Sequence, residues 1–274
     1  MRQILFIGDF RFREFQAAIE CLKSNSWLAL AIDVDDAITR VTKQRLCPEL
    51  IVIGQSHPGQ FSQVAIDRLH QLVPLARLVT VLGSWCESET RTGDPWPGVL
   101  RVYWHQFSTR LDRRFLRGET GGQWNLPRTS TDAEWLLTES SPKRNLAQRR
   151  LVVIRACNLS GYQALADALN AEGYATIWAA AEHHPYVSGQ SAGIWDSARL
   201  DSNEIKELKQ FTQRLRPAPV IALTNFPRQL DCRRLLSAGA ATVLGKPLSV
   251  SDLLNLLAGS IGDSSMPNRD AFAA

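Results

Sequence analysis

Ser237-Ala-Gly-Ala-Ala-Thr-Val-Leu-Gly-Lys-Pro-Leu-Ser-Val-Ser-Asp-Leu-Leu254 is the stretch that decides the fold, because an apolar strand delivers Lys246, followed by a proline, to its carboxyl end. Upstream, Thr224 closes the apolar run that ends at Leu223, and Asp196 closes the run that ends at Trp195. In open α/β sheets, the carboxyl ends of the strands carry the functional sites. The sequence therefore predicts an aspartate, a threonine and a lysine at the carboxyl ends of three consecutive strands.

The second half of the chain repeats the plan of the first. Four predicted strands match in order: Ile4–Ile7 with Leu151–Ile154 at an offset of 147 residues, Leu50–Ile53 with Ala192–Trp195 at 142, Leu78–Leu82 with Pro219–Leu223 at 141, and Val102–Phe107 with Val243–Leu248 at 141. Amphipathic helical spacing fills most gaps between them. Buried strands that alternate with helices predict a doubly wound parallel sheet with right-handed crossovers in each half.

Length and composition predict two domains. The chain has 274 residues, of which 45% are hydrophobic and 21% charged, as in ordinary globular proteins. We expect a first domain over residues 1–118, a connector over 119–148, a second domain over 149–260 and a disordered tail over 261–274. The connector is rich in Gly, Pro, Ser and Thr, but Trp124 and Trp135 predict that it packs on a domain or fastens the two together.

Composition also excludes several classes of protein. No apolar run approaches the roughly 20 residues that span a bilayer, and no signal-peptide pattern opens the chain, so we expect a cytoplasmic protein without a membrane partner. The five cysteines are scattered and are expected to be free thiols. No P-loop, G-x-S-x-G or dinucleotide fingerprint follows a strand. The net charge is +4, with basic residues gathered in Arg110–Arg117 and Lys143–Arg150. Nucleic acid is thus an unlikely partner but stays open.

On these residues and spacings, both halves resemble the receiver domains of two-component response regulators. The resemblance implies an α/β protein with two flavodoxin-like, doubly wound five-stranded parallel sheets in tandem. It also implies roles for three residues of the second half. Asp196 takes the place of the phosphoacceptor, Thr224 that of the residue that hydrogen-bonds the phosphoryl group, and Lys246 that of the lysine that pairs with it.

The second half departs from the family at its metal site. The family places two acidic residues after the first strand to bind Mg²⁺, whereas this chain has Arg155 and Ala156 there. A single carboxylate is too few for a normal Mg²⁺ site, and a guanidinium opposes a divalent cation, so we expect no metal or cofactor. Our hypothesis is that Arg155 and Lys246 converge on Asp196 as permanent cations. The alternative is that Arg155 points to solvent.

The first half departs further. The matched offsets place Gly54 at the acceptor position, Gly83 at the hydroxyl position and His105 at the lysine position, and Asp9 alone remains of the acidic pair. Phosphoryl transfer to this half is not expected. Two segments also replace expected helices with loops, Cys86–Gly98 in the first half and Glu182–Ser191 in the second.

The sequence therefore favours a non-catalytic signalling or adaptor protein built of two pseudo-receiver domains. Its expected partners are proteins: a histidine kinase, another signalling protein, or a second copy in a homodimer. The expected binding surfaces are the Cys86–Gly98 loop, with Trp96 as an exposed anchor, and the last strand and helix of the second half. Two alternatives remain, a true phosphorelay regulator phosphorylated on Asp196 and a nucleic-acid-associated protein that uses the arginine-rich segments.

Overall fold

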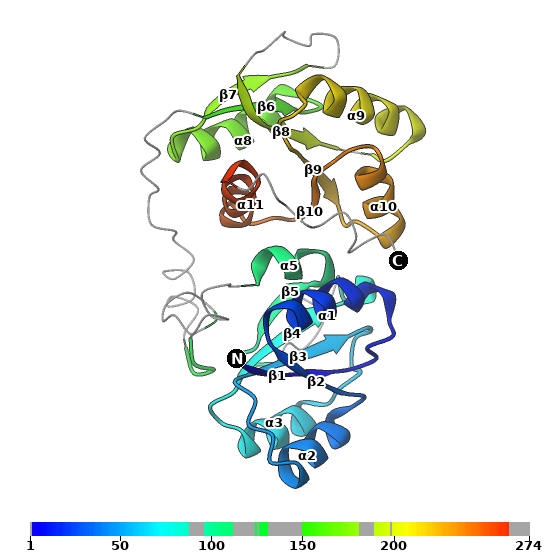
Figure 1. Ribbon diagram of the computed structural model, residues 1–274, viewed down its shortest axis with the longest axis vertical. Helices are drawn as coiled ribbons and strands as arrows, with labels where there is room; N and C mark the ends of the chain where they lie inside the picture. Colours follow the sequence, from blue (N-terminus) through cyan, green and yellow to red (C-terminus); the bar gives the residue numbers. More distant parts are fainter. Residues whose placement is uncertain are drawn as a thin grey trace. The chain divides into compact units, whose positions relative to one another are not determined.

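The chain divides into two compact units, Met1–Ser140 (unit 1) and Ser141–Ala274 (unit 2), each described here by itself. Figure 1 shows the computed structural model, which describes residues 2–87, 96–111, 124, 126–130, 150–180, 189–197 and 199–262. Most of the predicted connector, the tail from residue 263 and most of the 182–191 loop lie outside the described residues.

Unit 1 is built on a five-stranded parallel sheet of order β2-β1-β3-β4-β5. Its strands are β1 (Gln3–Ile7), β2 (Trp27–Ala31), β3 (Leu50–Gln55), β4 (Arg77–Leu82) and β5 (Leu100–Tyr103). Its helices are α1 (Arg13–Asn25), α2 (Val34–Lys43), α3 (Gln63–Leu72), the 3₁₀ turns η1 (Ser84–Cys86) and η2 (Trp104–Gln106), and α5 (Phe107–Arg110).

Unit 2 has the same strand order, because its sheet reads β10-β9-β8-β6-β7 and all of its pairs are parallel. Its strands are β6 (Leu151–Arg155), β7 (Ala175–Trp178), β8 (Gln190–Asp196), β9 (Val220–Asn225) and β10 (Thr242–Lys246). Its helices are α8 (Leu159–Ala171), α9 (Ser202–Leu215), α10 (Gln229–Ser237) and α11 (Val250–Gly262). The predicted α/β fold with two doubly wound parallel sheets in tandem is confirmed.

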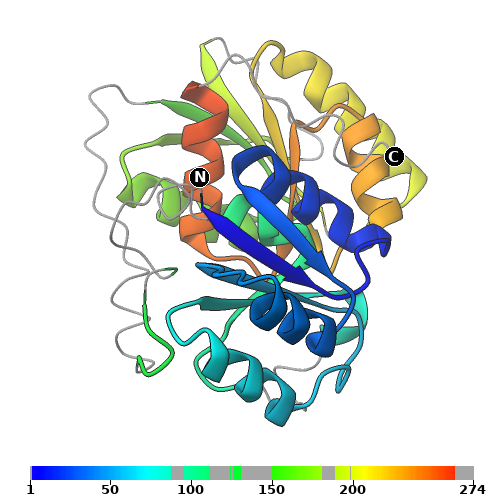
Figure 2. The ribbon, with the colours of Figure 1, turned by 60° about the horizontal axis from the view of Figure 1, so that its bottom comes forward.

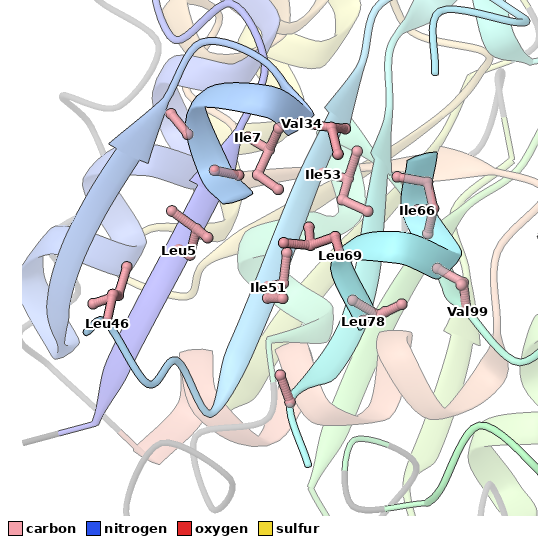
Figure 3. Close-up of a cluster of buried hydrophobic side chains, with 13 residues drawn as sticks. Leu5, Ile7, Val34, Leu46, Ile51, Ile53, Ile66, Leu69, Leu78 and Val99 are labelled. Atoms are coloured by element: carbon pink, nitrogen blue, oxygen red, sulfur yellow. The ribbon is translucent and has the colours of Figure 1, made fainter. Parts of the chain in front are cut away.

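The apolar cores explain why the sequences of these strands are continuous hydrophobic runs. In unit 1, β1, β3 and β4 pack against α2 and α3, which lie side by side in Figures 1 and 2, and Figure 3 shows the buried side chains between them. In unit 2, alternate residues of β6, β8, β9 and β10 face α8 and α11. Sheets covered by helices on both faces bury both faces of their central strands, which removes the polar alternation of a half-exposed sheet.

Three details differ from or add to the sequence predictions. Helix α11 continues through Gly259 and reaches Gly262, so residues 261 and 262 of the predicted disordered tail are helical. Trp124 is buried against Phe107, and the Arg128 side chain donates to Pro97 O and to Asp67, so this part of the predicted connector packs on unit 1. Within the described residues, no helix is long and apolar enough to span a bilayer.

Candidate functional site

Asp196 and Lys246 meet at the carboxyl end of the unit 2 sheet. Asp196 ends β8 and Lys246 ends β10, on the two sides of β9. Each lies two residues beyond a side chain of the α8–α11 core, Ile194 and Leu244 respectively, so alternation directs both to that face. Lys246 Nζ forms an ion pair with Asp196 Oδ1, and the two side chains are 28% and 18% exposed. The site is thus a half-buried ion pair that solvent can still reach.

The first turn of α8 lies beside the other oxygen of Asp196. Asn158 caps this helix by accepting a hydrogen bond from the Gly161 N–H at 2.8 Å. A Cβ on Gly161 would lie 3.5 Å from Asp196 Oδ2, so the carboxylate sits against the start of the helix. The N-terminus of a helix favours negative charge. The Cys157 thiol, which is exposed, approaches Asp196 O at 3.6 Å.

Thr224 does not join this pair in the described contacts. It is buried near the end of β9, with Gly245 of β10 as its register partner. Among the described residues, no hydrogen bond connects its hydroxyl to Asp196 or Lys246. The residue in register with Lys246 is Asn225, which is exposed.

Arg155 is turned away from Asp196, so the hypothesis that it replaces the metal ion is wrong. Its Nη2 pairs with Glu207 Oε2 of α9 at 3.3 Å, and its guanidinium lies 5.1 Å from the centre of the Trp195 ring. The alternative, exposure to solvent, is also wrong, because the side chain is 8% exposed. The reason is strand alternation: Arg155 follows Ile154, which faces α8 and α11, so Arg155 faces α9 instead.

Glu204 and Glu207 complete a polar cluster on the α9 face that sequence reasoning missed. Burial raises the pKa of the Glu204 carboxyl, an effect opposed by hydrogen bonding to Ser197 and by the charge of Arg155, whereas Glu207 adds to it. The signal was present in the sequence, because two glutamates three residues apart share one face of a helix that follows the Asp196 strand.

The residues at the unit 2 site do not fit Mg²⁺. Asp196 is already paired with Lys246, Ala156 supplies no side-chain oxygen, and Arg155 lies on the opposite face of the sheet. In the part of the chain that the structure describes, no group of three His, Cys, Asp or Glu side chains is placed to hold a metal ion. Mg²⁺ needs several hard oxygen ligands in near-octahedral geometry.

The corresponding corner of unit 1 contains no acceptor carboxylate on β3. Side-chain direction agrees with the match of Gly54 to Asp196: a Cβ on Gly54 would lie 2.9 Å from Phe15 Cε2 of α1, and Asp196 faces α8, the first helix of unit 2. The next residue, Gln55, continues the alternation of Ile51 and Ile53, which face the α2–α3 core, so Gln55 is directed to the opposite face of the sheet. Gln55 is buried.

His105 takes the lysine position of unit 1 but lies in η2, beyond the end of β5. It is 7% exposed and stacks on Tyr103. Burial lowers the pKa of its imidazole to about 4, so the ring is neutral at pH 7. Its Nδ1 has no hydrogen-bond partner among the described residues. In unit 1, the buried neutral imidazole of His105 thus takes the place that the alignment gives to the Lys246 cation of unit 2.

Glu14 supplies a carboxylate to the unit 1 corner from helix α1. Its Oε2 accepts the Ser84 N–H at 2.9 Å, and its Oε1 is hydrogen-bonded to the Ser84 hydroxyl. A Cβ on Gly83 would lie 2.8 Å from Glu14 Oε2, which explains a glycine at the hydroxyl position. Asp9, the remaining acidic residue of the family pair, is exposed and accepts the Arg11 N–H at 3.0 Å. Sequence reasoning did not single out Glu14.

No protein-family model matches the chain, and no curated protein is significantly similar to it in sequence. Solved structures give partial likenesses. The beryllofluoride-activated NtrC4 receiver domain is 20% identical, with 41% of this chain and 96% of that one covered and a TM-score of 0.36. An orphan response regulator of H. pylori is 15% identical over 42% and 99%, with a TM-score of 0.36. A two-component response regulator/GGDEF domain protein is 13% identical over 96% and 98%, with a TM-score of 0.38.

The identities and TM-scores of these likenesses are low, and the fold is established by the strand order alone. The strand order defines the class of fold, a tandem of two flavodoxin-like, doubly wound α/β domains with the order 2-1-3-4-5 in each sheet.

Proposed function

We propose that the chain is a non-catalytic adaptor, in which two receiver-like domains bind partner proteins without transferring phosphoryl groups. The observation that carries this proposal is the state of Asp196. Its carboxylate is paired with Lys246, and among the residues that the structure describes no group of three His, Cys, Asp or Glu side chains is placed to bind Mg²⁺. Phosphoryl transfer depends on a metal ion that neutralises the charge developing on the transferred group. Without it, Asp196 is a poor acceptor.

Unit 1 supports the same function more strongly. The acceptor position is Gly54, which has no side chain, and the lysine position is a buried neutral imidazole, His105. The carboxylate that is present, Glu14, accepts two hydrogen bonds from Ser84. None of these groups supplies a carboxylate nucleophile next to a cation, so this unit can act through its surface alone.

The unit 2 site is bordered by exposed apolar side chains that suit a protein partner. Phe226, Leu230 and Val250 are 52%, 67% and 46% exposed, and Leu159 at the start of α8 is 49% exposed. They belong to the segments that follow β6, β9 and β10, and the Phe226 N–H donates to Lys246 O at 3.2 Å. We call these four residues the apolar rim. Large apolar side chains left exposed together mark interaction sites in soluble domains.

On unit 1, the expected binding surface is the Cys86–Gly98 loop, with Trp96 as its exposed anchor. Trp96 is half-buried and packs on Phe61 and the unit 1 core, so the prediction of an exposed Trp96 is wrong. Trp85, in η1, is 77% exposed and takes that place. Residues 88–95 of the loop lie outside the described residues.

A phosphorylation experiment tests the absence of transfer. The full chain is incubated with Mg²⁺ and acetyl phosphate, and separately with beryllium fluoride, beside Asp196→Asn. We expect no phosphoryl adduct by intact mass and no beryllium fluoride binding by calorimetry. An adduct that disappears in Asp196→Asn would establish the alternative, a phosphorelay regulator. That alternative draws on one observation, the partial exposure of Asp196 beside Lys246.

A binding experiment tests the rim. Leu230→Asp should abolish capture of the partner protein by the full chain, whereas Leu75→Asp in unit 1, which is 97% exposed, should leave it unchanged. Equal capture by both variants would rule out the rim. The third function, nucleic-acid binding, draws on the Arg110–Arg117 and Lys143–Arg150 segments, of which residues 112–117 and 143–149 lie outside the described residues, and no contact among the described residues favours it.

A further inference from the structure

Strand β2 leaves one edge of the unit 1 sheet open. Within the described residues it pairs only with β1. Its five residues, Trp27–Ala31, include no charge and no proline, and Trp27 and the following Ile32 are 50% and 55% exposed. Natural sheets protect such edges with lysine, proline or a bulge, because an unprotected edge is a template for another strand. β2 has none of these protections.

The backbone groups that face this open edge can be identified from the pairing with β1. The Trp27 N–H donates to Arg2 O at 3.1 Å, and Ala31 O accepts the Gly8 N–H at 3.0 Å. Successive residues of a strand direct their backbone groups to opposite edges. Leu28 and Leu30 therefore direct their N–H and C=O groups away from β1, towards a further strand.

We propose that this edge pairs with the same edge of a second copy of the chain. The two β2 strands run antiparallel about a two-fold axis that passes at Ala29, so that the two five-stranded sheets become continuous. Leu28 then lies opposite Leu30 of the second copy, and the outward backbone groups of both residues form hydrogen-bonded pairs. The two-fold axis is perpendicular to the sheet, so it keeps each side chain on its own face of the joined sheet. Residues that lie opposite each other in this register therefore point to the same face.

Shape and charge favour a second copy as the occupant. In this register the large Trp27 lies opposite the small Ala31. The end of β2 nearest α1 has Lys23 in the last helical turn, and the end nearest α2 has Asp33 and Asp35 in the cap and first turn. All three are exposed. Antiparallel pairing brings the basic end of each copy to the acidic end of the other.

The equivalent edge of unit 2 is less suited to the same pairing. β7 has four residues instead of five. Its outward-facing Thr176 holds a side-chain network with Tyr162 and Asn170, at 3.3 and 3.4 Å. We therefore assign the dimer contact to unit 1.

A cysteine at the axis tests the register. In full-length chain with the exposed Cys47 and Cys157 changed to serine, Ala29→Cys places two thiols in a pair whose Cα atoms are about 4.5 Å apart, within disulfide reach. Trp27→Cys, on the same strand and face, places its thiols about 13 Å apart. Mild oxidation should give at least tenfold more disulfide dimer for Ala29→Cys. No dimer, or equal dimer in both variants, would overturn the proposal.

Mass measurement tests the contact itself. Light scattering should give twice 30.6 kDa for the full chain and 30.6 kDa for Leu28→Pro, which removes an outward N–H without touching the ladder to β1. Thr176→Pro is the matched control on β7 and should remain dimeric. A monomeric wild type, which would leave the edge to an extended segment of another protein, overturns the proposal, as does a dimeric Leu28→Pro. If circular dichroism shows that Leu28→Pro is unfolded, the two cysteine variants decide.

Discussion

The same corner of the same fold contains two different polar clusters in the two units. In unit 2 both charged groups come from strand ends, with Asp196 after β8 and Lys246 after β10. In unit 1 the carboxylate comes from a helix, as Glu14 of α1, and its donors belong to Ser84 after β4. The comparison teaches that the strand order can be kept while the polar groups at its carboxyl end are supplied by other elements.

The two arrangements also exclude each other. The buried faces of α1 and α8 match at an offset of 147 residues, with Ile19 against Ala166 and Leu22 against Leu169, which sets Glu14 against Gly161. A Cβ at Gly161 would lie 3.5 Å from Asp196 Oδ2. Unit 2 thus has room for the Asp196 carboxylate because the facing position of α8 is a glycine. Unit 1 does the reverse, with Gly54 on the strand and the Glu14 carboxylate on the helix. Four experiments address this difference, from the largest expected effect to the smallest.

Acid should destabilise unit 1 through His105. The native pKa is lowered to about 4 by burial, while the unfolded imidazole titrates near 6.5. Between those values the unfolded state binds a proton that the native state does not, so stability falls as pH falls and levels off below about 4, a loss of about 3 kcal/mol. Hydrogen exchange of β4 and β5 peptides measures this loss, and His105→Gln should flatten it. An unchanged pH dependence in that variant would contradict the assignment.

Removal of Lys246 should destabilise unit 2. Lys246→Met leaves a half-buried carboxylate without its cation, at a cost of about 2 kcal/mol, between the values for exposed and buried pairs. Urea unfolding of Lys246→Met, Asp196→Asn and the double variant measures the coupling. The exposed pair of Arg11 and Asp9 is the control, and Arg11→Met should cost less than about 0.5 kcal/mol. Additive losses for Lys246 and Asp196 would show that the pair does not interact.

Loss of Glu14 should loosen η1 of unit 1. Glu14→Ala removes the acceptor of both Ser84 hydrogen bonds, at a cost of about 1.5 kcal/mol for a partly exposed charged acceptor. Ser84→Ala keeps the N–H donor and should lose about half as much. Hydrogen exchange of residues 83–87 measures the effect. If Glu14→Ala leaves this segment as protected as in the wild type, Glu14 does not hold the corner together.

The smallest effect is expected for Gly161→Ala. The new Cβ would lie 3.2 Å from the capping oxygen of Asn158, which opposes a gain in helix propensity of up to about 1 kcal/mol, so the net change stays within about 0.5 kcal/mol. Thermal unfolding measures it. A large loss of stability would mean that Asp196 needs the space beside α8 more strictly than the distances indicate.

The sequence predicted the fold well because its signals are local and repeated. Buried runs such as Ile4–Ile7 and Val220–Leu223, separated by amphipathic helices, specify a parallel sheet, and the repeat specifies two of them.

The site was predicted less completely, because it depends on side-chain direction and on contacts far apart in the chain. The meeting of Asp196 and Lys246 follows from their places at the carboxyl ends of β8 and β10, on the two sides of β9. The direction of Arg155 was available from the alternation of side chains along a strand, because Arg155 and Ile154 must face opposite sides of the sheet. The contact of Glu14 with Ser84 spans 70 residues and carries no motif, so only the folded structure reveals it.

The exposed cysteines offer a practical route to these questions, because Cys47 lies in unit 1 and Cys157 in unit 2. Spin labels or a fluorescent donor and acceptor can be attached to these two thiols without new mutations, while Cys86 and Cys232 are buried and Cys21 is half-buried. Because Cys157 adjoins Asp196, a probe there also responds to events at the ion pair. A change in the label-to-label distance on addition of a binding protein would report how that protein rearranges the tandem.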